Sequence, residues 1–247
     1  MLGSIKNAIN IINCFSTDTP ELGVIDLAAQ LNMNKSTVHH VVKSLTAEGI
    51  LVKTKSRKYR LGSQLLGWGH TVTEQYKPFF MTIPYLDSLV KRTKEIVILA
   101  TLENEEVCCL AKIEPNKRIK FDTKVGARKP LHCSGAGKLF LAHQSEKVIK
   151  KILSKKLEQL TENTITDPAI LSIELEKIRE QGYAIDNEES EFGLFSVSVP
   201  IYNFLGEVIC SVSISGPEFR MSNKDYLDQL ISQLLITSQS ISTQCDF

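Results

Sequence analysis

The stretch NKSTVHHVVKSL, residues 34–45, decides how the first part of the chain folds. At 100° per residue its apolar side chains share one helical arc, formed by Val38, Val41, Val42 and Leu45. This periodicity predicts an amphipathic helix over residues 34–49, with Asn34 as its N-cap. The opposite face carries hydroxyl groups, imidazoles and one cation, on Ser36, Thr37, His39, His40, Lys43 and Ser44. Because the helix has no acid before Glu48, this face suits contact with phosphates or base edges.

The helix alone leaves two interpretations open. An ordinary surface helix and a helix that reads nucleic acid would both expose a polar face. A metal site is not expected, because His39 and His40 are adjacent and point about 100° apart on a helix. Chelation by a helix needs histidines at i,i+4 spacing.

The flanking segments favour the nucleic-acid reader. Two shorter helices are predicted upstream, with apolar positions at Ile5, Ala8, Ile9, Ile12, Ile25, Ala28 and Leu31. Downstream, GILVK and KYRLG are short alternating runs around the polar tip TKSR, which predicts a hairpin. Helix, helix, tight turn, helix and hairpin is the order of a winged helix-turn-helix.

Basic residues concentrate in this part of the chain. Residues 1–75 hold eight Lys or Arg against five Asp or Glu, although the whole chain has a net charge of only +1. A solvated basic face is the ordinary alternative, but beside a winged helix the charge indicates a polyanion partner. The predicted DNA-binding residues are Lys35, Ser36, Thr37, His39, His40, Lys43, Ser44, Lys55, Arg57 and Lys58, with Lys53 beside them on the wing.

Composition excludes several classes of protein. Apolar residues make up 43% of the chain and charged residues 23%, which is typical of soluble globular proteins. The sequence shows no leader and no apolar run of membrane-spanning length, so we expect a cytoplasmic protein without membrane contact. No C-x-x-C pair occurs, so six buried free thiols and no metal or other cofactor are expected. The cysteines are Cys14, Cys108, Cys109, Cys133, Cys210 and Cys245.

The second part of the chain has a different pattern. Residues 63–77 predict a helix that links a first domain, residues 1–62, to a second domain, residues 78–247. Beyond Pro78, the segments PYLDSLVKRT, SGAGKLFLAH, DPAILSIELEKIREQGY and 223–243 predict helices. Strands are predicted in EIVILATLENEEVCCLAKIE, which forms a hairpin, and in FSVSVPIY and EVICSVSIS. This grouping predicts an α+β domain with an antiparallel sheet.

Two of these strands carry serines at alternate positions. Period two places the serines of each strand on one face: Ser196 and Ser198 on the first, Ser211, Ser213 and Ser215 on the second. A half-exposed sheet with a polar solvent face would explain either strand alone. Asp186 and the turn CSGAGK favour a polar cavity, because the backbone N–H groups of Ser134, Gly135 and Ala136 can bind a carboxylate where a helix starts.

Catalytic motifs are incomplete. In HCSGAGK the P-loop pattern fails, because His132 stands where its first Gly belongs and Leu139 follows the Lys. The G-x-S-x-G pattern fails at His132 as well. Cys133 and His132 have no evident orienting acid, so we interpret them as a core residue and a structural residue. No catalytic residue is therefore predicted.

Several sequence blocks, in order, resemble the IclR family of bacterial transcription regulators. They are AINIINCFS, DLAAQLNMNKSTVHHVVKSLTAEGILVK and KYRLGSQLLGWG in the first domain, and GARKPLHCSGAGKLFLA, GYAIDNEESEFGLFSVSVPIY and SVSISGP in the second. The likeness covers nearly the whole chain. It implies an α-rich N-terminal winged helix-turn-helix that binds a double-stranded DNA operator, and a C-terminal GAF-like α+β domain that binds a small-molecule effector. It also implies a homodimer or homotetramer.

The resemblance further implies the effector contacts Gly135, Ala136, Asp186, Ser196, Ser213 and Ser215. Ser196 departs from the family, which often has cysteine there, so the identity of the ligand stays open. Phe121 and Ile119 are interpreted as an apolar lid.

The expected function is a ligand-responsive, sequence-specific transcription regulator that senses a small anionic metabolite such as an organic acid. The alternatives are a small-molecule-processing enzyme and a protein-interaction module, both built on the second domain. Repression or activation, the target genes and the effector's identity stay open.

Overall fold

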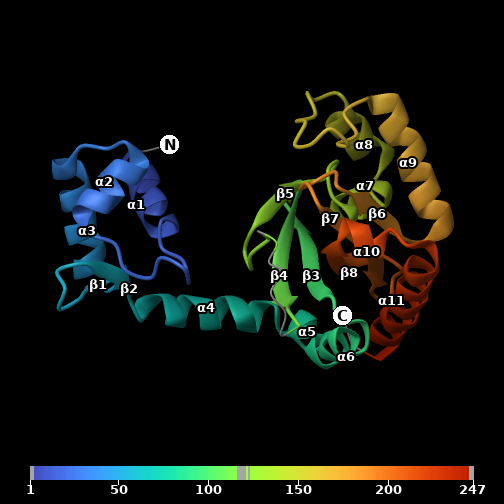
Figure 1. The fold of residues 1–247 in the computed structure, drawn as a ribbon, viewed down its shortest axis with the longest axis horizontal. Helices are drawn as coiled ribbons and strands as arrows, with labels where there is room; N and C mark the ends of the chain where they lie inside the picture. The colour runs from blue at the N-terminus through green and yellow to red at the C-terminus, as the bar shows by residue number, and fades with distance from the viewer. Residues whose placement is uncertain (1–2, 116–120, 122, 245–247) are drawn as a thin grey trace. The chain divides into compact units, whose positions relative to one another are not determined.

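At Pro78, where the hydrophobic pattern changes, the chain passes from one folded unit to another (Figure 1). The structure is a computed structural model and describes residues 3–115, 121 and 123–244. Unit 1 is Met1–Lys77 and unit 2 is Pro78–Phe247. The finer division of unit 1, into a domain of residues 1–62 and a linker helix of residues 63–77, stays a prediction.

Unit 1 has the element order of a winged helix-turn-helix. Its elements are α1 (Gly3–Asn13), α2 (Val24–Leu31), α3 (Lys35–Ala47), β1 (Leu51–Lys53), β2 (Tyr59–Leu61) and α4 (Gln64–Gln75). Strands β1 and β2 pair antiparallel, as predicted, and form the wing. Asn32 turns the chain after α2 with a left-handed φ of 50°, which a short polar side chain tolerates. Asn34 occupies the N-cap position of α3, but its side chain makes no capping hydrogen bond.

The core of unit 1 forms around α3. Val38, Val42 and Leu45 are buried, as the helical arc predicts, and Val41 is half-buried. The predicted stripes of the two upstream helices are partly wrong: Ile5, Ile9 and Ile25 are exposed. The buried positions there include Ile11, Leu27 and Ala28. Short helices with apolar residues on more than one side bury whichever side meets a neighbour, and here α1 and α2 both pack on α3.

Unit 2 is built on one sheet with the strand order β5-β4-β3-β8-β7-β6, and every pairing is antiparallel. The strands are β3 (Ile96–Glu103), β4 (Glu106–Ile113), β5 (Arg128–Pro130), β6 (Ala184–Asn187), β7 (Leu194–Tyr202) and β8 (Val208–Pro217). The helices are α5 (Lys77–Phe80), α6 (Ile83–Thr93), α7 (Gly135–Ala142), α8 (Glu146–Leu153), α9 (Pro168–Gln181), α10 (Glu218–Met221) and α11 (Lys224–Gln244). The Asp167 carboxylate caps α9 by accepting hydrogen bonds from the N–H groups of Ala169 and Ile170.

Helices cover the sheet from both sides. Helix α7 packs on β6, β7 and β8, whereas α11 packs on β7 and β8, and α6 packs on β3 (Figure 1). The serine face lies toward α7, because a Cβ on Gly135 would stand 2.7 Å from Ser198 Oγ. The serines of β7 and β8 are all buried, so the half-exposed sheet is the wrong explanation for their spacing.

Two further sequence expectations concern membranes and cysteines. In the part of the chain that the structure describes, no helix is long and apolar enough to cross a membrane. The five described cysteines form no disulfide, and all except the half-buried Cys14 are buried. Cys245 and Ile119 lie outside the described residues.

Candidate DNA-binding and effector sites

The polar face of α3 is open to solvent. Six of the predicted contact residues of this helix are exposed: Lys35, Ser36, His39, His40, Lys43 and Ser44. The seventh, Thr37, is half-buried. Ser44 Oγ donates a hydrogen bond to the carbonyl of His40, 3.2 Å away, and the rings of His39 and His40 meet edge to face. Burial of the opposite arc therefore leaves hydroxyl, imidazole and ammonium groups facing outward together.

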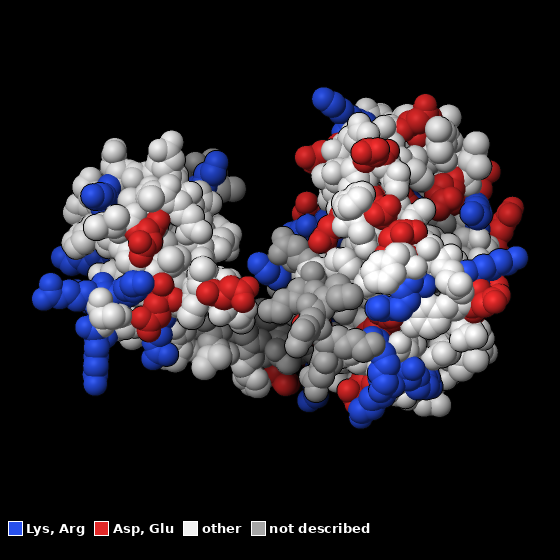
Figure 2. All heavy atoms as spheres, viewed as in Figure 1, with Lys and Arg blue, Asp and Glu red and all other residues white. Residues whose placement is uncertain are grey.

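The wing adds exposed cations, and a carboxylate from the loop between α1 and α2 lies against it. Lys55, Arg57 and Lys58 are all exposed at the tip of the β1–β2 hairpin. Figure 2 shows Lys and Arg side chains gathered on the side of unit 1 that carries this hairpin. Glu21 Oε2 accepts a hydrogen bond from Ser56 Oγ at 3.1 Å, so one acid lies against the wing. Local sequence patterns do not predict this contact, because Glu21 and Ser56 are far apart along the chain.

A cavity of about 50 Å³ lies between the serine face of the sheet and the start of α7. All six predicted effector contacts line it: Gly135, Ala136, Asp186, Ser196, Ser213 and Ser215. Ser134, predicted as part of the helix start that binds a carboxylate, also lines it. The lining residues that were not predicted are Ile98, Ala100, Val107, Cys109, Thr123, Ala127, Lys129, Ser190 and Leu194. Phe121 lies elsewhere, beside Glu95, Ser215 and Arg220, so the structure does not bring it to this cavity as a lid.

Strand register assembles the polar wall of this cavity. Asp186 on β6 pairs with Ser196 on β7, which pairs in turn with Ser215 on β8. In the next row, Ser198 and Ser213 pair, and their hydroxyl oxygens lie 2.7 Å apart in a hydrogen bond. Ser198 therefore supports Ser213 from behind the cavity wall.

The start of α7 forms the facing wall. Ser134 is its N-cap, and its Oγ accepts a hydrogen bond from the N–H of Gly137 at 3.1 Å. Lys138 N–H bonds to the Ser134 carbonyl, which leaves the N–H groups of Gly135 and Ala136 as the open donors of the first turn. A helix start with open N–H groups favours an anion.

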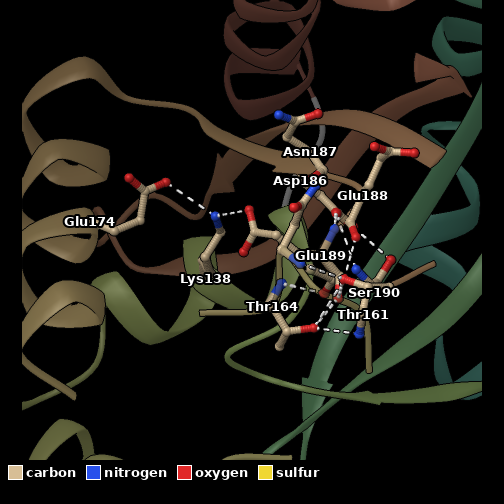
Figure 3. A network of polar contacts seen from close by, with 12 residues as sticks. Lys138, Thr161, Thr164, Glu174, Asp186, Asn187, Glu188, Glu189 and Ser190 are labelled. Carbon is tan, nitrogen blue, oxygen red and sulfur yellow. Dashed lines mark hydrogen bonds and ion pairs between the residues drawn. The ribbon is translucent and has the colours of Figure 1, made fainter. Parts of the chain in front are cut away.

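Both carboxylate oxygens of Asp186, which lines the cavity, are engaged by the turn that follows β6. Its Oδ1 accepts hydrogen bonds from the N–H groups of Glu189 and Ser190, and its Oδ2 accepts one from Ser190 Oγ (Figure 3). Burial raises the pKa of the Asp186 carboxyl, although these hydrogen bonds oppose that rise. Asp186 thus shapes the turn of residues 186–190 that borders the cavity.

A buried ion network stands behind α7. Lys138 Nζ lies 2.6 Å from Glu189 Oε1 and 3.1 Å from Glu174 Oε1, so the helix is tied both to the 186–190 turn and to α9 (Figure 3). Lys138 and Glu189 are almost completely buried, and Glu189 Oε2 has no hydrogen-bond partner among the described residues. Burial raises the pKa of Glu189 to about 7, because loss of solvation outweighs the attraction of Lys138.

The raised pKa predicts a pH-dependent stability that Glu189→Gln should remove. Between the ordinary pKa of 4.5 and the folded value of about 7, only the unfolded chain ionises this carboxyl, so the folded state loses stability as pH rises. Urea unfolding at several pH values should show Glu189→Gln gaining stability relative to the native protein across this window. Parallel pH profiles for the two proteins would contradict the prediction.

Cys133 and His132, interpreted from the sequence as a core residue and a structural residue, make contacts of that kind in the structure. Burial raises the pKa of the Cys133 thiol to about 12, so it is protonated and a poor nucleophile at neutral pH. His132 Nε2 bonds to the carbonyl of Glu158 at 2.8 Å and does not engage Cys133. Within the described ranges, no cluster of three His, Cys, Asp or Glu side chains is arranged to hold a metal ion.

Comparison with known protein families agrees with this architecture. Residues 4–55 match the domain described as "IclR helix-turn-helix domain", and residues 72–243 match "Bacterial transcriptional regulator IclR C-terminal". The chain belongs to the IclR family of bacterial transcription regulators. It is therefore a DNA-binding regulator with an effector-binding domain, and not an enzyme.

Individual relatives support the same assignment. "HTH-type transcriptional regulator BhcR" of Paracoccus denitrificans is 32% identical over 222 residues, which cover 89% of this chain and 79% of that protein. "HTH-type transcriptional regulator KdgR" of Escherichia coli is 30% identical over 248 residues, with 100% and 94% covered.

Solved structures share the fold over the whole chain. The crystal structure of Thermotoga maritima IclR superposes with a TM-score of 0.83 and 29% identity, covering 100% of both chains. An IclR homolog from Microbacterium hydrocarbonoxydans complexed with 4-hydroxybenzoate gives a TM-score of 0.81 and 25% identity, covering 97% of this chain and 98% of that one. The predicted two-domain fold class is confirmed.

Proposed function

We propose that α3 reads the major groove of a DNA operator while the wing holds the phosphate backbone. The observation that carries this proposal is the exposed, acid-free polar face of α3. Ser36, Thr37, His40 and Lys43 supply the base contacts, since hydroxyl, imidazole and ammonium groups can bond to base edges. The remaining predicted residues, Lys35, His39, Ser44, Lys55, Arg57 and Lys58, set the register through phosphates.

The proposed effector is a small anionic metabolite, an organic acid, bound in the cavity between α7 and the sheet. The open N–H groups of Gly135 and Ala136, together with the hydroxyls of Ser196, Ser213 and Ser215, supply donors for a carboxylate. The relative from Microbacterium hydrocarbonoxydans is complexed with 4-hydroxybenzoate, itself an organic acid, which supports this ligand class.

Effector binding is proposed to change the spacing of paired DNA-binding units through the linker helix of residues 63–77. A ligand can shift this equilibrium only if its affinity differs between the two arrangements. We propose a homodimer or homotetramer acting in the cytoplasm, and a symmetric oligomer predicts a palindromic or repeated operator.

Selection of genomic DNA fragments by the purified full-length protein, at two salt concentrations, tests this function. We expect one enriched motif and an affinity that falls steeply with salt, because Lys and Arg release counterions from phosphates. Selection is run with and without a mixture of organic acids, since the effector can be required for binding. No enrichment under either condition, or binding without salt dependence, would favour a protein-interaction module instead.

Replacing His40 and Lys43 together with Ala should reduce the preference for the selected motif over random DNA by roughly 10- to 100-fold, as expected when base-edge contacts are removed. Binding to random DNA should change much less. Lys6→Ala is the matched control, because Lys6 is an exposed cation on α1 outside the proposed surface. Undiminished specificity in the double variant would remove α3 from the mechanism.

A further inference from the structure

Lys129 reaches the effector cavity from the edge of the sheet. It stands on β5, paired with Val107 of β4, and both residues line the cavity. Alternation along a strand sends Arg128 to the other side, where its guanidinium forms an ion pair with Glu103. The two consecutive cations of β5 therefore have different surroundings: Arg128 is paired outside, and Lys129 faces inward.

Among the described residues the Lys129 ammonium forms no direct ion pair, although its charge attracts that of Asp186 and lowers the pKa of that carboxyl. Its Nζ donates a hydrogen bond to Ser190 Oγ at 3.2 Å, and this hydroxyl in turn donates to Asp186 Oδ2. An ammonium has three donors, and a neutral hydroxyl satisfies one of them. Lys138, by contrast, lies between two carboxylates and does not line the cavity.

A second set of donors lines another wall of the same cavity. Ser196 and Ser215 are only 6% and 3% exposed, and their hydroxyls form no hydrogen bond with another described side chain or backbone group. Beside them lie the N–H groups of Gly135 and Ala136. These groups suit one carboxylate, which leaves the charge of Lys129 for another anionic group.

We propose that Lys129 is a specificity-determining residue and that the effector is a short dicarboxylate. One carboxylate binds the start of α7 and the serines, and the other binds Lys129. Lys129 and the start of α7 line one cavity of about 50 Å³, so a short chain with a carboxylate at each end suits both. The inference rests on the proposed function, because it refines the ligand of that same cavity.

Titration calorimetry on the full-length protein tests this pairing with two named series of probes. The dicarboxylates are oxalate, malonate and succinate; the monocarboxylates are acetate, propionate and butyrate. The native protein should bind its best dicarboxylate at least tenfold more tightly than any monocarboxylate. Lys129→Met should weaken that binding by roughly 10- to 100-fold, the loss expected for a charge-assisted hydrogen bond, and leave monocarboxylate binding unchanged.

Arg128→Met is the matched control, since it removes the neighbouring cation on the other side of β5 and should keep the preference for dicarboxylates. Lys129→Arg should retain part of that preference, which separates the loss of charge from a loss of folding. Equal affinity for both series, or a preference that survives in Lys129→Met, overturns the inference and leaves the organic-acid site intact. Binding of neither series overturns the dicarboxylate assignment, whereas operator selection independently decides whether the protein is a DNA regulator.

Discussion

We expect Lys138→Met to lower the free energy of unfolding by about 3–5 kcal/mol at pH 8, the loss typical of a buried ion pair that keeps one charged partner. Lys138 is 1% exposed and is the shared partner of Glu174 and Glu189. Without it, Glu189 must either stay an unpaired buried charge or take up a proton, because Lys138 no longer holds its pKa down, and its second oxygen already lacks a partner among the described residues. Methionine has a similar length and therefore removes the charge without leaving a large void.

Urea unfolding measures this loss, and two variants control it. Lys150→Met removes an exposed i,i+4 pair with Glu146 and should change stability by less than about 0.5 kcal/mol. The double variant Lys138→Met/Glu189→Gln should recover part of the loss, because it also removes the stranded charge. Equal stability of Lys138→Met and the native protein would show that the network contributes nothing to folding.

We expect Gly137→Ala to destabilise unit 2 by about 3 kcal/mol, the upper part of the range for overpacking. A Cβ at this position would lie 2.6 Å from the carbonyl oxygen of Leu131 and 2.9 Å from its C and Cα atoms. All three are backbone atoms, so no side-chain rotation can relieve the clash. The backbone of α7 would have to move away from Leu131, and this movement would disturb the segment that carries the N-cap Ser134.

Gly69→Ala is the control for this substitution. Gly69 lies in the exposed helix α4 with no atom within 4 Å of the added Cβ, so alanine should be neutral or stabilising by about 0.5–1 kcal/mol. Thermal unfolding of both full-length variants makes the comparison. A Gly137→Ala protein as stable as Gly69→Ala would mean that α7 is packed less closely than the structure indicates.

Much of the fold follows from periodicity alone. The arc of Val38, Val42 and Leu45 predicted α3 and its buried side, because a helix with one broad apolar face has one way to pack. Alternating serines likewise predicted β7 and β8. The short elements α5, α8, α10, β5 and β6 were not predicted, since three to eight residues carry little periodic signal. Strands β1 and β2 are as short, but the polar tip between them marked the hairpin.

The candidate site was only partly predictable, for a different reason. Alternating serines, Asp186 and the CSGAGK turn predicted a polar cavity, and the resemblance assigned its six effector contacts. The structure brings these six residues together around one cavity; their contact with a ligand stays a prediction. Lys129 was missed because β5 was not recognised as a strand, and strand register decides which side chain faces inward. Ser190 and the Lys138 network depend on contacts between distant segments, which local patterns do not encode.

The ion network behind α7 has a consequence for biosensor engineering. Lys138, Glu174 and Glu189 tie α7 to α9 and to the 186–190 turn, whereas Ser196, Ser213 and Lys129 line the cavity. The residues that stabilise the fold of the site therefore differ from those proposed to select the ligand. Directed evolution can therefore randomise the second set to obtain sensors for new metabolites while the first set keeps the binding wall in place.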